Sequence, residues 1–261
     1  MRILVTNDDG ISAPGLEVAE EIATALAGEN GEVWVVAPAF EQSGVGHCVS
    51  YIRPMRLEKL GARRFAVEGS PADCVLAGIG EIMRDAPPDL VLSGVNRGHN
   101  VAEDTVYSGT IGGAMEGALH GVRSVALSQY YGPPGREPRD PFAAARAHGA
   151  DVLRRLIAAE VWPERPYAVF HNVNFPSIPA EDVRGIRATF QGARPAPTFG
   201  VLPHVAPNGR TFLWLTNTPG NAETAEGSDS RESYDGFITV TPLSADLTVH
   251  SLVSPLAQAL G

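Results

Sequence analysis

Two adjacent carboxylates follow the first strand-like segment of the sequence. Asp8 and Asp9 come directly after the apolar run Ile3–Thr6. Two like charges held close together repel, and each raises the pKa of the other unless a cation neutralises them. Mg²⁺ and Mn²⁺ are the cations that best suit carboxylate, amide and hydroxyl oxygens. The pair therefore predicts a divalent metal site. The alternative is that one aspartate caps a turn while the other faces solvent.

A third oxygen ligand stands after a later strand. Asn96 follows the strand-like segment Asp89–Ser93. In open α/β sheets, ligands bind outside the carboxyl ends of the strands, near the point where the strand order reverses. We therefore expect Asp8, Asp9 and Asn96 to meet at one sheet edge as catalytic and metal-binding residues. The histidines show no HExxH or His–Cys spacing, so zinc is not indicated, and His47 and His99 are interpreted as solvated loop residues.

The tripeptide Ser108-Gly109-Thr110 opens a helix-like segment and could hold an anion. Free N–H groups and the helix dipole favour phosphate at such a position, and glycine allows close approach. Together with a carboxylate metal site on the same sheet edge, the motif is typical of phosphoryl transfer. The alternative is an ordinary serine or threonine helix cap.

The elements that must position these residues alternate between strand and helix. Such alternation predicts a three-layer α/β/α fold with a Rossmann-like, mostly parallel sheet. The expected strands are Ile3–Thr6, Glu32–Ala37, Asp89–Ser93, Val122–Leu127 and Tyr167–Val173, with a hairpin of Val49–Leu57 and Arg64–Val67. The expected helices are Pro14–Ala27, one capped by Ser70 and ending near Arg84, Thr110–His120 and Phe142–Ala159.

Toward the C-terminus the composition changes. Residues 193–241 are rich in Pro, Gly, Asn and Thr, and Thr211–Leu215 and Phe237–Thr241 are the only strand-like stretches among them. We therefore expect one domain over residues 1–261, with a core of about 1–192 and 242–261 and an extended arm of about 193–241. Apolar groups on an arm without its own core need a partner surface, so a homodimer or homotetramer is expected.

The composition limits the classes of partner. The net charge is −10 and no Lys/Arg-rich run exists, so binding to a nucleic-acid polymer is not expected. No apolar run approaches the roughly 20 residues of a membrane span, and no signal segment precedes the first strand, so we expect no membrane association and a cytoplasmic location.

Five motifs together resemble the SurE (stationary-phase survival protein) family of nucleotidases. They are ILVTNDDGISAPG (Ile3–Gly15), VVAPAFEQSGVGH (Val35–His47), SPADCV (Ser70–Val75), LVLSGVNRGHN (Leu90–Asn100) and DTVYSGTIGGAMEG (Asp104–Gly117). Weaker similarity follows in HNVNFP (His171–Pro176) and DGFITVTPL (Asp235–Leu243). The resemblance thus covers most of the chain in the expected order.

The resemblance implies a metal-dependent phosphatase that acts on nucleoside 5′- and 3′-monophosphates, and on short polyphosphate as well in some members. It implies one Mg²⁺ or Mn²⁺ per subunit, held by Asp8, Asp9, Ser43 and Asn96, and phosphate at the Ser108–Thr110 turn. It also implies a C-terminal arm exchanged between subunits. The sequence departs from the family pattern at Ala39-Phe40, where Asp-Arg is usual, and at Ala102, where glycine is usual.

Three other functions are compatible with paired acids after a first strand. An aspartyl-phosphate phosphatase would use a carboxylate nucleophile, commonly from an Asp-x-Asp motif, whereas these aspartates are adjacent. A signalling receiver domain would need a separate phosphoacceptor aspartate after its third strand, and the later loops offer no clear candidate. A non-catalytic nucleotide-binding module is the third alternative.

Overall fold

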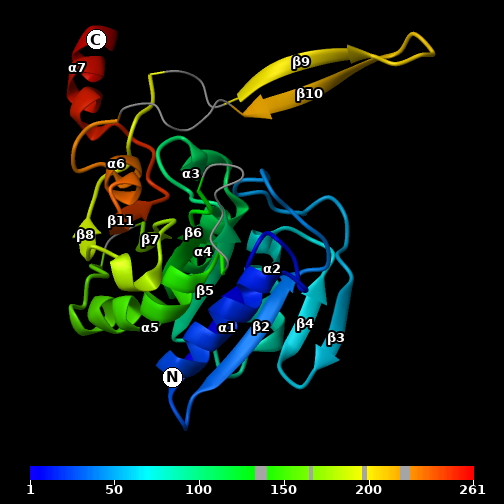
Figure 1. Cartoon of the computed structure of the whole chain (residues 1–261), viewed down its shortest axis with the longest axis vertical. Helices are drawn as coiled ribbons and strands as arrows, with labels where there is room; N and C mark the ends of the chain where they lie inside the picture. Colours follow the sequence, from blue (N-terminus) through cyan, green and yellow to red (C-terminus); the bar gives the residue numbers. More distant parts are fainter. Residues whose placement is uncertain (133–139, 165–166, 196–198, 218–223) are drawn as a thin grey trace.

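The computed structural model describes residues 1–132, 140–164, 167–195, 199–217 and 224–261. Within these ranges, nine strands form one central sheet in the order β3-β4-β2-β1-β5-β6-β7-β11-β8. The strands are β1 (Arg2–Thr6), β2 (Glu32–Pro38), β3 (Leu57–Gly61), β4 (Arg64–Val67), β5 (Leu90–Arg97), β6 (Arg123–Gln129), β7 (Val169–Phe175), β8 (Ile186–Ala188) and β11 (Ile238–Ser244). Figure 1 shows this sheet with helices packed against it.

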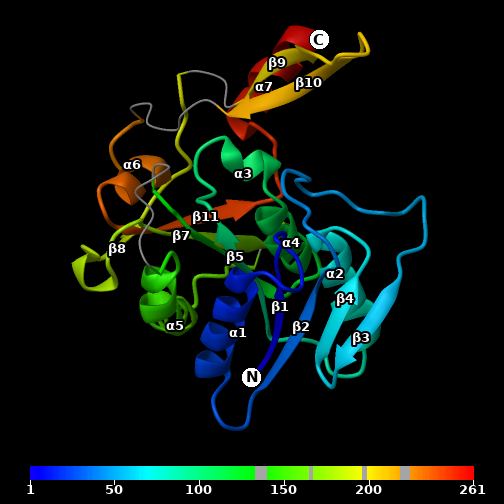
Figure 2. The ribbon, with the colours of Figure 1, turned by 45° about the vertical axis from the view of Figure 1, so that its right-hand side comes forward.

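The sheet is mostly parallel. Strands β4, β2, β1, β5, β6 and β7 run in one direction, whereas β3 pairs antiparallel with β4 and β11 pairs antiparallel with β7. Helices α1 (Pro14–Ala27) and α5 (Ala143–Ala158) cover one face, as Figure 2 shows. Helices α2 (Pro71–Ala77) and α4 (Gly109–Leu119) cover the other face. The predicted α/β fold class is confirmed.

Helix α1 follows from its sequence. Pro14 stands at the first helical position, where its missing N–H costs nothing. Leu16, Ala19 and Ile22 recur at helical spacing and are buried against the sheet. Gly28 ends the helix with φ 73°, a conformation that glycine adopts without a Cβ clash. The helix therefore begins and ends where the sequence predicted.

The order of the strands brings two strand ends together beside the first one. From β1 the chain moves to β2 on one side, and it later returns to β5 on the other side of β1. The carboxyl ends of β1 and β5 therefore lie at the switch point, where open α/β sheets bind their ligands. The loop Asn7–Gly10 and the β5 end Asn96–Arg97 come from these two strands.

Two predicted elements differ from the observed ones. Val49–Leu57 is not a strand: the strand that pairs with β4 is Leu57–Gly61, and Tyr51 and Ile52 lie exposed in a loop. The Ser70 capping box is confirmed, because Ser70 and Asp73 exchange hydrogen bonds of 2.8 and 3.1 Å. The regular helix nevertheless ends at Ala77 and continues only as a wider turn, η1 (Gly78–Ile82).

The C-terminal part divides differently from the prediction. Strands β9 (Phe199–Val205) and β10 (Thr211–Asn217) form a separate two-stranded hairpin that projects from the sheet in Figure 1. Beyond it, α6 (Asp229–Tyr234) and β11 belong to the body of the protein, because β11 pairs with β7 and β8. The arm predicted over 193–241 therefore extends too far, and residues 196–198 and 218–223 of it lie outside the described residues.

Helix α7 (His250–Leu260) also departs from expectation. It was assigned to the core as part of 242–261, yet every one of its residues is exposed, including Leu252, Val253 and Leu256. Figures 1 and 2 both place it apart from the central sheet. Of the helices in the described ranges, none combines the length and the apolar character that crossing a membrane requires.

Candidate active site

The loop after β1 has a defined conformation. Asn7 donates from Nδ2 to the carbonyl oxygen of Gly10 at 2.9 Å, and Gly10 has φ 101°, a value that favours glycine. The N–H of Gln42, from the loop after β2, donates to the carbonyl oxygen of Asp8 at 2.7 Å. These bonds hold the backbone of the two aspartates, so their side chains leave the loop in fixed directions.

The Asp8 side chain is buried and is held by one residue of α4. Thr110 donates its hydroxyl to Oδ1 at 2.7 Å and its backbone N–H to Oδ2 at 3.1 Å. Burial, opposed by the Thr110 bonds and helped by the charge of Asp9, raises the pKa of Asp8 to about 6. No cationic side chain in the described part of the chain offsets this carboxylate.

Asp9 also follows β1, one residue after Asp8, and it is less buried than Asp8. Its Oδ2 accepts a hydrogen bond of 3.0 Å from the backbone N–H of Arg97, at the end of β5. Burial raises the pKa of Asp9, and the charge of Glu41 adds to the shift, whereas the backbone N–H and the charge of Arg97 oppose it. The two strand ends are thus joined through Asp9, and two carboxylates with raised pKa values stand side by side.

The start of α4 meets Asp8 at close range. A Cβ on Gly109 would lie 2.9 Å from the Asp8 Cβ and 3.1 Å from its Oδ2, so only glycine fits against this carboxylate. The backbone of Gly109 is not in the left-handed region, so its role is space and not φ. The space was predicted to receive a phosphate oxygen, and in the structure it contains Asp8.

The three residues of the predicted phosphate motif have different surroundings. Ser108 is the N-cap of α4, since its Oγ accepts from the Ile111 N–H at 3.2 Å, and the helix-cap alternative is correct to that extent. Both donors of Thr110 are used by Asp8. Within the described part of the chain, the N–H groups of Ser108 and Gly109 have no hydrogen-bond acceptor.

A cavity of about 380 Å³ brings four predicted site residues together. Its lining includes Asp8, Ser43, Asn96 and Ser108. The Ser43 hydroxyl donates to Glu41 Oε1 at 2.9 Å, and the Asn96 amide donates to the Gly98 carbonyl oxygen at 3.0 Å. Because these bonds use the hydrogens, the lone pairs of Ser43 Oγ and the Asn96 amide oxygen are left to other partners.

The donor set at this edge consists of oxygen atoms. Among the described residues, no group of three or more His, Cys, Asp or Glu side chains could hold a metal ion. Asp8 and Asp9 supply two carboxylates, and Ser43 and Asn96 supply neutral oxygens. Such a set suits a hard cation that keeps several of its own waters, such as Mg²⁺ or Mn²⁺.

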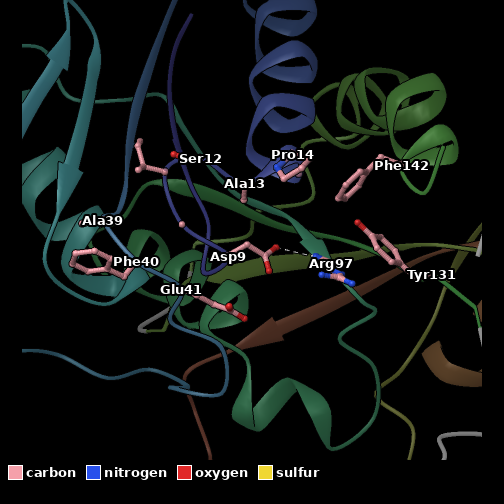
Figure 3. Close-up of a pocket in the computed structure, with 13 residues that line it drawn as sticks. Asp9, Ser12, Ala13, Pro14, Ala39, Phe40, Glu41, Arg97, Tyr131 and Phe142 are labelled. Atoms are coloured by element: carbon pink, nitrogen blue, oxygen red, sulfur yellow. Dashed lines mark hydrogen bonds between the residues drawn. The ribbon is translucent and has the colours of Figure 1, made fainter. Parts of the chain in front are cut away.

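A second cavity, of about 500 Å³, lies on the other side of Asp9. Figure 3 shows Asp9 and Arg97 at its centre, with Phe40 and Tyr131 on opposite sides and the start of α1 above. Arg97 and Tyr131 line both cavities, so the two cavities meet at these residues. The site is therefore a cleft with two compartments joined beside the paired aspartates.

Several buried polar residues near the site escaped the sequence analysis. Asn100 donates to Asn174 and Ser128 at 2.8 Å each, and its carbonyl oxygen accepts from Asn172 at 2.7 Å. Asn100 lies in the loop after β5, and its partners belong to β6 and β7, so long separations along the chain leave no local pattern. Their hydrogen bonds fix the loop that follows Asn96.

The two loop histidines differ in their exposure to solvent. His99 stacks on Tyr130 with ring centroids 4.3 Å apart, and burial, together with the charge of Arg194, lowers its pKa to about 3. His47 contacts the carboxylate of Glu116 on α4, and this contact lowers the pKa of Glu116. The interpretation of His99 as a solvated side chain was wrong, because residues distant in the sequence enclose its ring, whereas His47 is exposed, as the sequence analysis expected.

Comparison with known proteins agrees with this geometry. The model of the family "Survival protein SurE" matches residues 3–197. The 5′-nucleotidase SurE of Roseobacter denitrificans is 59% identical over 257 residues, covering 98% of each chain, and that of Ruegeria pomeroyi is 56% identical over 262 residues, covering 100% of each. The SurE protein structure from Aquifex aeolicus superposes with a TM-score of 0.82 at 34% identity over 100% of both chains. The chain belongs to the survival protein SurE family.

Proposed function

We propose that this protein is a divalent-metal-dependent 5′-nucleotidase that hydrolyses nucleoside 5′-monophosphates to nucleoside and phosphate. The observation that carries the proposal is the pair Asp8–Asp9, two carboxylates with raised pKa values at the sheet switch point. Among the described residues, no cationic side chain offsets Asp8, and the charge of Arg97 offsets Asp9 only in part. Its relatives named 5′-nucleotidase SurE support the substrate class. Activity on nucleoside 3′-monophosphates and on short polyphosphate is part of the same proposal.

The metal would be held by Asp8, Asp9, Ser43 and Asn96, as one Mg²⁺ or Mn²⁺ per subunit. The hydrogen-bond pattern supports this set, because Thr110 and the Arg97 N–H orient the carboxylates while Ser43 and Asn96 direct their hydrogens elsewhere. A divalent cation would also offset the charge that burial makes costly at Asp8. When bound, such a cation supplies Lewis acidity for a phosphoryl group and for water.

The protein's own groups would bind and orient the phosphate. The N–H groups of Ser108 and Gly109, at the positive end of α4, are available to phosphoryl oxygens, whose charge is spread further in the transition state. Thr110, whose donors are already used, would position the Asp8 carboxylate. Asn96 and Asp9 would act beside it as catalytic residues, held by the β5 end.

An aspartyl-phosphate mechanism is less compatible with this arrangement. A carboxylate nucleophile must reach phosphorus, yet Asp8 is only 3% exposed and both of its oxygens accept bonds from Thr110. Trapping labelled phosphoaspartate during turnover would favour that mechanism. A receiver domain or a binding module would show no steady multiple turnover of a nucleotide.

Assembly is a further part of the proposal. The β9–β10 hairpin exposes Leu202, Leu213 and Leu215, and α7 exposes Leu252 and Leu256. Surfaces of this kind require a partner, and we expect a homodimer or homotetramer formed through the hairpin. The proposed location is the cytoplasm, and no binding to nucleic-acid polymers is expected.

A substrate panel tests the proposed function. Phosphate release should be measured from the four common nucleoside 5′-monophosphates and from 3′-AMP, with Mg²⁺ and Mn²⁺ added separately. The proposal expects multiple turnovers of at least one 5′-monophosphate with one of these metals. No phosphate release from any nucleoside monophosphate with either metal would contradict it.

A further inference from the structure

One aromatic ring beside the site is mostly exposed to solvent. Phe40 follows β2 directly after Ala39, is 69% exposed and lines the 500 Å³ cavity next to Asp9. Within the described part of the chain, its ring contacts no other aromatic ring and no cation. A large apolar side chain left in water at a cavity wall gains free energy when a ligand covers it.

On the opposite side of this cavity, the aromatic ring of Tyr131 has packing partners, unlike that of Phe40. Tyr131 packs edge-on against Phe142 with ring centroids 5.4 Å apart, and the Arg97 guanidinium lies 5.6 Å from the centroid of Tyr131. Ile11 and Pro14, from the start of α1, supply further apolar lining, and Ser12 and Glu41 supply polar groups. The cavity thus combines apolar side chains with the charged groups of Asp9, Glu41 and Arg97, and its volume is within the range of roughly 300–1,000 Å³ that is usual for small-molecule sites.

The other compartment is less suited to a planar ligand. Its rings already pair with one another: His99 stacks on Tyr130, and Tyr107 packs edge-on against Phe199 with ring centroids 5.0 Å apart. That compartment also holds the polar atoms of Asp8, Ser43 and Ser108. The 380 Å³ cavity therefore offers phosphate-binding groups beside rings that already have ring partners, whereas the 500 Å³ cavity offers the exposed ring of Phe40.

The geometry points to the 500 Å³ cavity as the nucleobase subsite, with the base stacked on Phe40. This inference rests on the proposed function, because it assigns one part of the same substrate. A phosphate in the 380 Å³ cavity places the attached nucleoside within reach of the 500 Å³ cavity, since Arg97 and Tyr131 border both. Every nucleobase has a π-face, and purines offer more area for stacking than pyrimidines. Phe40 is thus a specificity-determining residue.

Kinetics with and without a base on the substrate test this subsite. In Phe40→Ala, KM for 5′-AMP should rise about tenfold, while kcat changes little and kinetics with ribose 5-phosphate, which lacks a base, stay within about twofold of wild type. The preference for purine over pyrimidine monophosphates should fall. Phe40→Trp should keep the wild-type KM for 5′-AMP. Tyr51→Ala removes another exposed ring, 88% exposed and outside the cavity, and should change nothing.

Two results would overturn the inference while leaving the proposed function intact. One is an unchanged KM for 5′-AMP in Phe40→Ala. The other is an equal rise in KM for 5′-AMP and ribose 5-phosphate, accompanied by a change in oligomer mass, which would assign Phe40 to a subunit contact. Adenosine binding, followed by saturation-transfer NMR, gives a readout independent of turnover. Loss of the adenosine signal in Phe40→Ala supports the subsite, and an unchanged signal contradicts it.

Discussion

A single threonine fixes the orientation of Asp8, the first aspartate of the proposed metal site. Thr110 contributes two donors to Asp8 across 102 residues of sequence, and Gly109 provides the space in which that carboxylate lies. The motif was predicted from its likeness to an anion cradle, and the structure gives its third residue a different partner. Sequence patterns could not reveal this pairing, because nothing near residue 8 encodes which distant hydroxyl will face it.

The raised pKa of Asp8 predicts a pH-dependent stability in the absence of metal. Its folded pKa of about 6 exceeds its ordinary value of 3.8, so the folded protein retains a proton that the unfolded chain releases between these values. The stability contributed by Asp8 is therefore full below pH 4 and lost as pH rises through about 6, a change of about 3 kcal/mol. Asp8→Asn does not titrate and lacks this loss.

Urea denaturation in EDTA at pH 4.5 and pH 7.5 measures the effect. The free energy of unfolding of wild type, taken relative to Asp8→Asn, should fall between the two pH values. Added Mn²⁺ should restore wild type but not the variant, because ligand binding stabilises the folded state that binds it. Parallel pH profiles for the two proteins would show that Asp8 is not desolvated.

Ala102 stands where the family usually has glycine, and its backbone angle shows why glycine suits this position. It has φ 51°, and its N–H lies 3.1 Å from Asp229 Oδ2, which fixes this conformation. An L-residue pays roughly 1–2 kcal/mol in the left-handed region, and glycine does not. Ala102→Gly should therefore raise the stability by about 0.5–1 kcal/mol after the entropy of the unfolded chain is subtracted.

Thermal unfolding compares this variant with Ala25→Gly, on the exposed side of α1. Glycine within a helix costs about 1 kcal/mol, so the two substitutions should shift Tm in opposite directions. A lower Tm for Ala102→Gly would show that the alanine fits this angle without strain.

At the level of elements, the close approach of α4 depends on its glycines. A Cβ on Gly112 would lie 2.4 Å from the Gly46 carbonyl oxygen, and one on Gly117 would lie 2.4 Å from Ser124 Oγ. These glycines let α4 lie directly on the sheet and on the loop after β2, which contains Ser43 and Gly46. The helix itself was predictable from its sequence. How closely it packs on the sheet was not, because that depends on the shapes of the neighbouring elements.

Gly109→Ala should therefore displace the Asp8 carboxylate. A shift of this kind is expected to lower kcat/KM by about 100-fold, because small misplacements of catalytic groups are costly, while stability falls by about 1–3 kcal/mol from overpacking. Gly80→Ala is a matched control, since a Cβ there meets nothing within 4 Å. A folded Gly109→Ala enzyme with near-normal kcat/KM would separate this turn from the site.

The regular elements around β1 were predicted well because buried strands and amphipathic helices leave local patterns. The helix Pro14–Ala27 and the strand after it are examples. The strand assigned to Val49–Leu57 was misplaced, since apolar residues such as Tyr51 and Ile52 can also lie in an exposed loop. Likewise, Phe237–Thr241 was assigned to the arm because of its neighbours' composition, whereas pairing with β7 places β11 in the sheet.

For the whole molecule, the apolar hairpin predicts an assembly. Leu213 and Leu215 on β10 are 68% and 73% exposed, and charges placed there would be buried without partners in an interface. The double variant Leu213→Glu/Leu215→Glu should therefore have the mass of a monomer in sedimentation velocity experiments, whereas wild type should be a dimer or tetramer. The double variant Leu57→Glu/Leu60→Glu, on exposed β3, should keep the wild-type mass. A wild-type protein that is monomeric at all concentrations would contradict this assembly.

The central claim is that Asp8 and Asp9 hold a divalent cation for the hydrolysis of a nucleoside 5′-monophosphate. The most direct measurement is phosphate release from 5′-AMP by wild type, Asp8→Asn and Asp9→Asn, each first in EDTA and then after addition of excess Mn²⁺. Wild type should be inactive in EDTA and recover with Mn²⁺. Both variants should stay folded and remain at least about 1,000-fold less active, because a neutral amide cannot offset the charge of the cation. Full activity of exhaustively chelated wild type, or of either variant, would contradict the account.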